Sequence, residues 1–376
     1  MSAIDWGILV AKVIVVFVGL LLSVILYVWF ERKIIADFQT RPGPLRAGPR
    51  GVLVTLADGL KLFFKEGIVP TDSYTAAYLI APTIAMIPGF LAFAVVPFGP
   101  PITIFGREVT MQLADLNIGV LWVLAMTSIG VYAIVLAGWG SGSNYPLLGA
   151  IRSTAQMISY EVAMSLAIIA VLMFSGQVRM SAIVDAQTTI WYVLPQFPAF
   201  VIFFICALAE TNRPPFDLAE AESELVAGFH TEYSGIRFAF FMLGEYVNTV
   251  VVAAIAVTLF LGGWLGPWPS GWPGWLGGLL WFVVKVTAVI YLMVLVRGTL
   301  PRMRYDRLMN FGWKVLIPAG FWWVMTTGAI IVLPERYGRW RGIFIAVGFA
   351  AAVALLASVV RPGLDREPAA REEEAA

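Results

Sequence analysis

Residues 7–30 read GILVAKVIVVFVGLLLSVILYVWF, an apolar run of 24 residues whose only charge is Lys12. A helix rises 1.5 Å per residue, so about 20 apolar residues cross a hydrocarbon core of about 30 Å. Because lipid offers the peptide groups no hydrogen-bond partner, a run of this length must be helical there. The run is too long for a removable signal peptide, and no small-residue cleavage site follows it. It therefore predicts a membrane-spanning helix.

Eight further apolar runs of comparable length follow along the chain. They occupy residues 74–97, 116–138, 156–175, 193–210, 236–262, 276–297, 314–333 and 342–360. We expect an all-α fold, a polytopic integral membrane protein with about nine transmembrane helices in one domain over residues 1–360. The polar remainder, 361–376, reads RPGLDREPAAREEEAA and predicts a disordered tail.

The composition of the chain excludes several classes of protein. Of its 376 residues, 60% are hydrophobic and 13% are charged, whereas about 25% of the residues of a soluble domain are charged. This excludes a soluble globular enzyme and a disordered chain, and a net charge of +1 also excludes a nucleic-acid binder. A single cysteine, Cys206, and a single histidine, His230, argue against a disulfide framework, an Fe–S cluster, a thiolate zinc site and a bis-histidine haem. Chemistry here must use carboxylates, basic side chains or a partner's cofactor.

Lysine and arginine are distributed unequally between the two sides of the predicted bundle. The connections 31–66, 139–155, 211–235 and 297–314, together with the tail, hold 17 of the 25 basic residues, against 5 in the alternate connections. Because positively charged loops remain in the cytoplasm, the N-terminus is expected outside and the C-terminus inside. The cytoplasmic face then carries nearly all of the polar chemistry.

The first inner loop, 31–70, contains the segment RPGPLRAGPRG followed by a short amphipathic pattern. The prolines and glycines prevent a helix in that segment. After it, apolar residues from Val52 to Phe64 recur at helical spacing, with Asp58, Lys61 and Lys65 elsewhere around the helix. This predicts an interfacial helix. It is either a surface anchor, which the composition favours, or a doorway for an amphipathic, lipid-soluble molecule.

Acidic residues mark the third inner loop and three predicted spans. In the loop, Asp217, Glu220 and Glu224 share one face of an expected short helix opened by Asp217 and Glu220 as a capping box, while Glu222 points elsewhere. Glu161, Glu210 and Glu245 lie in or at the ends of spans, where a charge is costly and usually functional. These acids form either a proton relay or ion pairs with residues such as Lys12 and Lys285.

Four stretches together resemble one family closely: ERKIIADFQTRPGPLRAGPRGVLVTLADGLKLFFKE, GWGSGSNYPLLGAIRSTAQMISYE, NRPPFDLAEAESELVAGFHTEYSGIRFAFFMLGEY and RGTLPRMRYDRLMNFGWKVLIP. They are similar to the family of the H subunit, a membrane subunit of proton-pumping NADH:quinone oxidoreductase, respiratory complex I. The resemblance runs in order over about residues 30–350. It implies a subunit at the junction of the membrane and hydrophilic arms that forms the membrane half of a quinone chamber. GWGSGS at 138–143 does not fit a dinucleotide-binding loop, and there is no Walker A or HExxH sequence.

The resemblance also assigns roles to individual residues. It implies a quinone entrance and lining formed by Arg41, Arg46, Asp58, Lys61 and Phe63, with Arg297 nearby. It implies a buried proton channel formed by Glu161, Glu210 and Glu245, and an acidic coupling loop formed by Asp217, Glu220, Glu222 and Glu224. Some relatives carry a glutamate where this chain has Ser128, so one proton station is expected to be missing or replaced by water. No residue is assigned to a metal.

The same resemblance implies the partners and the location of the chain. It would bind no cofactor itself. Quinone, either ubiquinone or menaquinone, would be the substrate, and Fe–S clusters and FMN would lie in partner subunits. The expected partners are the Fe–S and quinone-site hydrophilic subunits at the cytoplasmic face and the small and antiporter-like membrane subunits, in the plasma (inner) membrane. Quinone reduction is expected to shift the acidic loop and so change the protonation of the channel.

Three alternatives remain on the sequence alone. The nearest is the ion-translocating membrane subunit of an energy-converting hydrogenase or of a ferredoxin- or deazaflavin-linked dehydrogenase; the complete inner loops favour a quinone-using enzyme. A stand-alone transporter is disfavoured because no internal repeat is found and nine spans do not divide evenly. An assembly scaffold would use the same charges only to dock its partners.

Overall fold

The computed structural model describes residues 3–104, 106–217, 226–267, 273–337 and 348. Within these residues seven helices are long and apolar enough to cross a membrane. They are α1 (Ala3–Phe38), α3 (Thr75–Phe93), α4 (Gly119–Gly140), α5 (Asn144–Ser175), α9 (Gly235–Phe260), α10 (Gly274–Thr299) and the continuous helical segment Tyr305–Leu333, made by α11 (Tyr305–Phe311), a π-helical turn (Gly312–Leu316) and α12 (Ile317–Tyr337). The prediction of an all-α, polytopic membrane protein is confirmed.

Two of the nine predicted spans need separate comment. The run 193–210 forms α7 (Phe197–Glu210), a helix of only 14 residues. It begins late because Pro195 precedes it and Pro198 lies in its first turn, where a missing N–H costs nothing. The run 342–360, the acidic residues Glu220, Glu222 and Glu224, and the tail lie outside the described residues.

The shorter elements flank the two ends of the bundle. The predicted amphipathic helix is present as α2 (Val54–Phe64), while α6 (Met180–Asp185) lies at the opposite end. Beside α6 is a feature that the sequence did not predict, a hairpin of β1 (Gly99–Ile104) and β2 (Arg107–Met111). Its register is irregular between Gly99 and Ile102 because Pro100 and Pro101 have no N–H to donate.

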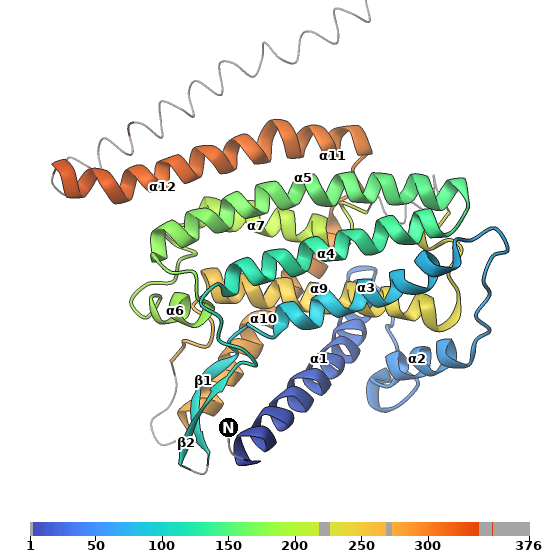
Figure 1. Ribbon diagram of the computed structural model, residues 1–376, viewed down its shortest axis with the longest axis horizontal. Helices are drawn as coiled ribbons and strands as arrows, with labels where there is room; N and C mark the ends of the chain where they lie inside the picture. The colour runs from blue at the N-terminus through green and yellow to red at the C-terminus, as the bar shows by residue number, and fades with distance from the viewer. Residues whose placement is uncertain (1–2, 105, 218–225, 268–272, 338–347, 349–376) are drawn as a thin grey trace, which may run out of the picture.

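The helices pack side by side in a bundle in which α9 is central (Figure 1). The order of contacts runs from α12 through α5, α4 and α3 to α9, and then to α10 and α1. Helix α9 also contacts α2, α6 and α7, and it is more buried than the other candidate spans. Polar side chains on α9 are therefore placed between several helices rather than against lipid.

The end of the bundle near the hairpin is fastened by side chains that cap backbone groups. Lys285 on α10 donates to the carbonyl oxygens of Leu261, Gly263 and Leu265 at 2.6, 3.1 and 2.5 Å, just after α9 ends. Its ammonium also lies 4.1 Å from the centre of the Trp191 ring. These acceptors are the C-cap of α9 and two residues of the loop that follows it, so Lys285 satisfies backbone carbonyls of the turn that ends the helix. Lys285 was a candidate partner for an acid on the sequence alone, but the end of α9 takes its donors instead.

Candidate functional site

A cluster of charged side chains lies where α1, α9 and α10 approach the loop after α7. Glu31 of α1 is 3% exposed. Its carboxylate pairs with Arg297 of α10, lies 3.9 Å from Arg213, and accepts a hydrogen bond from the Tyr246 hydroxyl at 3.1 Å. A buried carboxylate is stable only when it is paired in this way. Glu31 therefore organises three separate segments of the chain.

Arg213 lies between two acids in this cluster. Its Nε atom is 3.0 Å from Oε1 of Glu245, an ion pair without the alignment of a hydrogen bond. Its guanidinium also stacks 4.4 Å from the centre of the Tyr246 ring. Burial opposes the charge, but the carboxylates, Glu245 before Glu31, hold the pKa of Arg213 well above its ordinary value. Arg213 is thus a permanent cation shared by Glu245 and Glu31.

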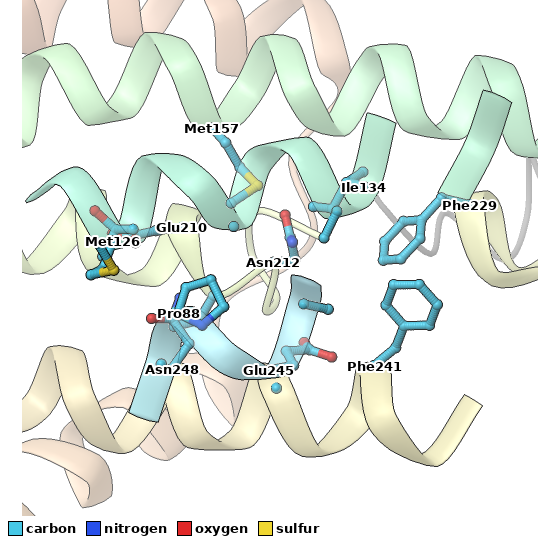
Figure 2. A pocket seen from close by; sticks show the side chains of 17 residues that line it. Pro88, Met126, Ile134, Met157, Glu210, Asn212, Phe229, Phe241, Glu245 and Asn248 are labelled. Atoms are coloured by element: carbon cyan, nitrogen blue, oxygen red, sulfur yellow. The ribbon is translucent and has the colours of Figure 1, made fainter. Parts of the chain in front are cut away.

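On the other side of Glu245 is a cavity of about 80 Å³ between α3, α4, α5, α9 and the end of α7, with mainly apolar walls and a few polar side chains. Figure 2 shows Glu245 and Asn248 on α9, with Asn212 approaching from the loop that follows α7. Glu210, Thr127 and Thr211 also line the cavity. One water occupies about 10–15 Å³ on this scale, so the cavity has room for several hydrogen-bonded waters.

Glu210 is the more enclosed of the two acids that line the cavity. Its residue is 7% exposed, and neither carboxylate oxygen has an aligned hydrogen bond to a described residue, although Asn248 lies beside it. It is also close enough to Glu161 for the two charges to repel each other. An ionised carboxylate is costly in such surroundings unless water or a proton relieves it. Glu210 is therefore suited to bind and release a proton.

Glu161 on α5 is connected to α4 through Ser128. The Ser128 hydroxyl is within hydrogen-bond reach of the Glu161 carboxylate and also 2.9 Å from the Leu124 carbonyl oxygen. A hydroxyl has one proton, so it donates either to the carboxylate or to the carbonyl. When it donates to Leu124, its oxygen can accept from a protonated Glu161. The position expected to lack a proton station is thus a hydroxyl that can serve either protonation state of Glu161.

A separate groove of about 620 Å³ lies between α1, α2 and α9. Its walls are mainly apolar, and among its lining residues are the predicted entrance residues Asp58, Lys61 and Phe63. Asp58 pairs with Arg32 at 2.8 Å and with Lys61 at 3.5 Å, so charges lie along one margin of the groove. Tyr246 lines the groove and donates to Glu31, whereas its neighbour Glu245 lines the cavity. The two spaces therefore lie against different faces of α9 at consecutive residues, with the charged cluster beside them.

Comparison with known proteins gives the family of the chain. The sequence profile of the NADH dehydrogenase family matches residues 11–328. The H subunit of NADH-quinone oxidoreductase from Frankia casuarinae is 49% identical over 372 residues, 98% of this chain and 82% of the relative. The protein of the same name from Frankia alni is 48% identical over 362 residues, 95% of this chain and 80% of the relative. The chain belongs to the family of NADH-quinone oxidoreductase H subunits. It is a membrane subunit of an enzyme complex, so further subunits accompany it.

The structure brings together only part of the set of residues to which the family resemblance gave roles. Asp58, Lys61 and Phe63 share the groove, Glu210 and Glu245 share the cavity, and Arg297 joins the charged cluster. Arg41 instead donates to Gln39 at 2.7 Å and lies against another hollow, of about 540 Å³, and Arg46 is exposed. Asp217 is half-buried and lines neither the groove nor the cavity. The family assignment favours a subunit of the quinone oxidoreductase over the three alternatives considered from the sequence.

Three important residues were not singled out from the sequence, namely Glu31, Arg213 and Tyr246. Glu31 follows directly after the apolar run 7–30 and begins the first inner loop, and nothing in that position distinguishes a buried acid from an exposed one. Arg213 is the only arginine or lysine in the connection 211–235, which was a usable signal for a partner of the acids. His230, in contrast, lies within an aromatic cluster of Phe229, Phe238 and Phe241. Burial lowers the pKa of His230 to about 4, so it is neutral at pH 7.

Proposed function

We propose that this chain forms the membrane wall of the quinone chamber of its complex and couples quinone reduction to proton translocation through buried carboxylates. The observation that carries the proposal is the adjacency of two spaces across consecutive residues of α9. Tyr246 lines an apolar groove of 620 Å³, and Glu245 lines a smaller cavity whose few polar residues include Glu210. An apolar groove suits a lipid-soluble quinone, and a wet cavity with acids suits protons.

The α2 side of the groove supports the role of an entrance. Helix α2 carries exposed apolar side chains, among them Leu60, Phe63 and Phe64 at 54, 69 and 87% exposure. A helix with such a face lies in the membrane interface. A quinone headgroup arriving from the bilayer would pass this helix, meet the pair Asp58–Lys61 and reach Tyr246. The isoprenoid tail would remain along the apolar residues of α1 and α9.

Coupling would then run through the charged cluster. Reduction of a quinone to a quinol consumes two electrons and two protons, and electrons would arrive from an Fe–S cluster of a partner subunit, since this chain would hold no redox group. A change of charge in the groove acts first on Tyr246 and Glu31. Arg213 would respond by shifting its pairing between Glu31 and Glu245. Glu245, when less well paired, would take up a proton from the cavity, and Glu210, Glu161 and Ser128 would continue the path.

The charges of the loops support the proposed placement. The groove and the cluster would lie near the cytoplasmic face of the plasma membrane, with the N-terminus outside, because basic connections favour the cytoplasmic side. The hydrophilic subunits with Fe–S clusters, FMN and the rest of the quinone site would dock on this face. The antiporter-like subunits would lie beside this chain in the membrane, and the proton path would continue into them. The acidic loop containing Asp217, Glu220, Glu222 and Glu224 is proposed to link quinone reduction to proton translocation.

Glutamine substitutions test the relay. In membranes that contain the assembled complex, Glu210→Gln and Glu161→Gln should each lower NADH-driven quinone reduction and proton pumping at least tenfold. NADH oxidation by a water-soluble artificial acceptor should stay within twofold of wild type, which shows that the complex is assembled. Glu108→Gln, an exposed glutamate of β2, is the matched control and should change neither activity. If proton pumping survives unchanged in both test variants, these residues do not form the relay.

A further inference from the structure

A second apolar groove runs along the face of α1 opposite to α2. It has two lobes of about 550 Å³ each, which share Val15, Val16, Phe98 and Met111 as lining residues. One lobe lies between α1 and the β1–β2 hairpin, and the other continues between α1, α9 and α10 as far as Phe30. Because the two lobes have common walls, they form one continuous groove.

The groove is recessed between exposed rims, as a binding site is, and is not simply the outer surface of a helix. Its floor is made of buried side chains, with Leu20 at 3% and Phe282 at 4% exposure, while Val15 and Val283 at its rims are 66% and 50% exposed. Gly19 lies within the groove, and a Cβ atom added there would meet nothing within 4 Å. An occupant would therefore contact apolar atoms on three sides.

One cation stands at the hairpin end of this groove. Lys12 lines the lobe beside the hairpin, and among the described residues it is the only charged one that lines either lobe. Within the described part of the chain its side chain forms no ion pair and no hydrogen bond; the nearby Asp5 pairs with Arg107 of the hairpin. An ammonium in such apolar surroundings requires an anion or water. The charge of Lys12 therefore indicates an anionic occupant, whereas the apolar walls alone would accept any apolar one.

The depth of Lys12 identifies the anion. Lys12 lies within the first three turns of α1, and a lysine near the end of a membrane helix extends its ammonium toward the lipid headgroups. The ammonium is therefore placed to meet a lipid phosphate of the leaflet on the hairpin side. Below it, a single leaflet offers an acyl chain about 15 Å, half of the core, or about ten residues of helix. The groove is longer than this, since it continues to Phe30, and its part from Val15 to Leu26 is enough to hold one acyl chain.

We propose that this groove binds one phospholipid, with its phosphodiester on the Lys12 ammonium and one acyl chain along α1 between the hairpin and α10. The site is separate from the quinone groove, which lies on the other face of α1. It would fill the space beside the helix that carries Glu31. The ligand class is a glycerophospholipid with a free phosphodiester charge, and phosphatidylglycerol is the simplest probe.

Photolabelling of the purified complex in nanodiscs tests the proposal. The probe is phosphatidylglycerol with a diazirine on its acyl chain, and the labelled peptides are mapped by mass spectrometry. Label should concentrate on residues 15–26 and on the facing part of α10. Gly19→Leu, which fills the groove, should reduce this label at least fivefold. Gly274→Leu, at an open and exposed glycine outside the groove, is the matched control and should retain it.

Substitution of the cation separates the headgroup from the chain. Lys12→Ala should lower the label at least threefold, and Lys12→Arg should restore it, because guanidinium also binds a phosphodiester. Label spread evenly around α1, or unchanged by Gly19→Leu, would mean ordinary annular lipid and would overturn the proposal. So would displacement of the label by excess quinone, or cross-linking of this face to a helix of another subunit.

Discussion

Substitution of Glu31 by glutamine should be among the most destabilising single changes on the inner side of the bundle. The Glu31 side chain is 4% exposed and lies between Arg213 and Arg297, whose side chains are 11% and 27% exposed. Removing one member of a buried ion pair costs about 3–5 kcal/mol, because the remaining charge is left without compensation. Arg213 retains Glu245, and Arg297 is partly in contact with solvent, so we expect the lower end, about 3 kcal/mol.

A double-mutant cycle measures this effect in the solubilised complex. Thermal inactivation of NADH:quinone activity and intrinsic fluorescence would be followed for Glu31→Gln, Arg297→Gln and the double variant. The double variant should recover about 1 kcal/mol of the loss, since it removes one of the two uncompensated cations. Arg32→Gln is the control: its pair with Asp58 is largely exposed and should be worth at most about 1 kcal/mol. A Glu31 variant no less stable than the Arg32 variant would refute the reasoning.

The groove, the Ser128 contact and the buried histidine each give a further prediction. Gly59→Leu, at an α2 position where an added Cβ meets nothing within 4 Å, should project into the 620 Å³ groove and raise the KM for a long-tailed quinone at least threefold, while kcat changes less. Ser128→Ala should slow coupled turnover about tenfold and Ser128→Thr should preserve it, as measured by proton pumping per NADH oxidised. Because burial lowers the pKa of His230 to about 4, the unfolded chain binds more protons than the native chain below pH 6.5. Stability should therefore fall on acidification, by about 2 kcal/mol at pH 5, and thermal inactivation of His230→Gln should lack this component.

Much of the fold could be predicted from the sequence because lipid imposes one simple requirement. A run such as 7–30 has only one stable form in a bilayer, so length and apolarity sufficed to predict α1. The same argument does not extend to the hairpin at 99–111, because outside the core water can satisfy the backbone and nothing in the composition demands strands. The short length of α7 was not predicted. The apolar run 193–210 indicates which residues are buried, but Pro195 and Pro198 decide where the helix begins.

Of the residues of the candidate site, only the acids could be predicted from the sequence. Glu161, Glu210 and Glu245 stood out because acids are rare at membrane depth. Their partners did not, since Arg213 meets Glu31 across 182 positions of sequence, and that contact depends on how α1 packs against α9. The roles of Arg41 and Arg46 were carried by the resemblance alone, and the described geometry places both outside the groove.

The charged cluster also has a property that belongs to the group rather than to any one pair. Glu31 and Glu245 contribute two negative charges, and Arg213 and Arg297 contribute two positive ones, so the four side chains sum to zero. In a region of low dielectric, an electroneutral group resists any net charge placed beside it. Under the proposed coupling, a negative charge that arrives in the groove would be matched by a proton entering the same neighbourhood. The balance of four side chains would thereby fix a one-to-one ratio between charge delivered on one face of α9 and protons drawn from the other.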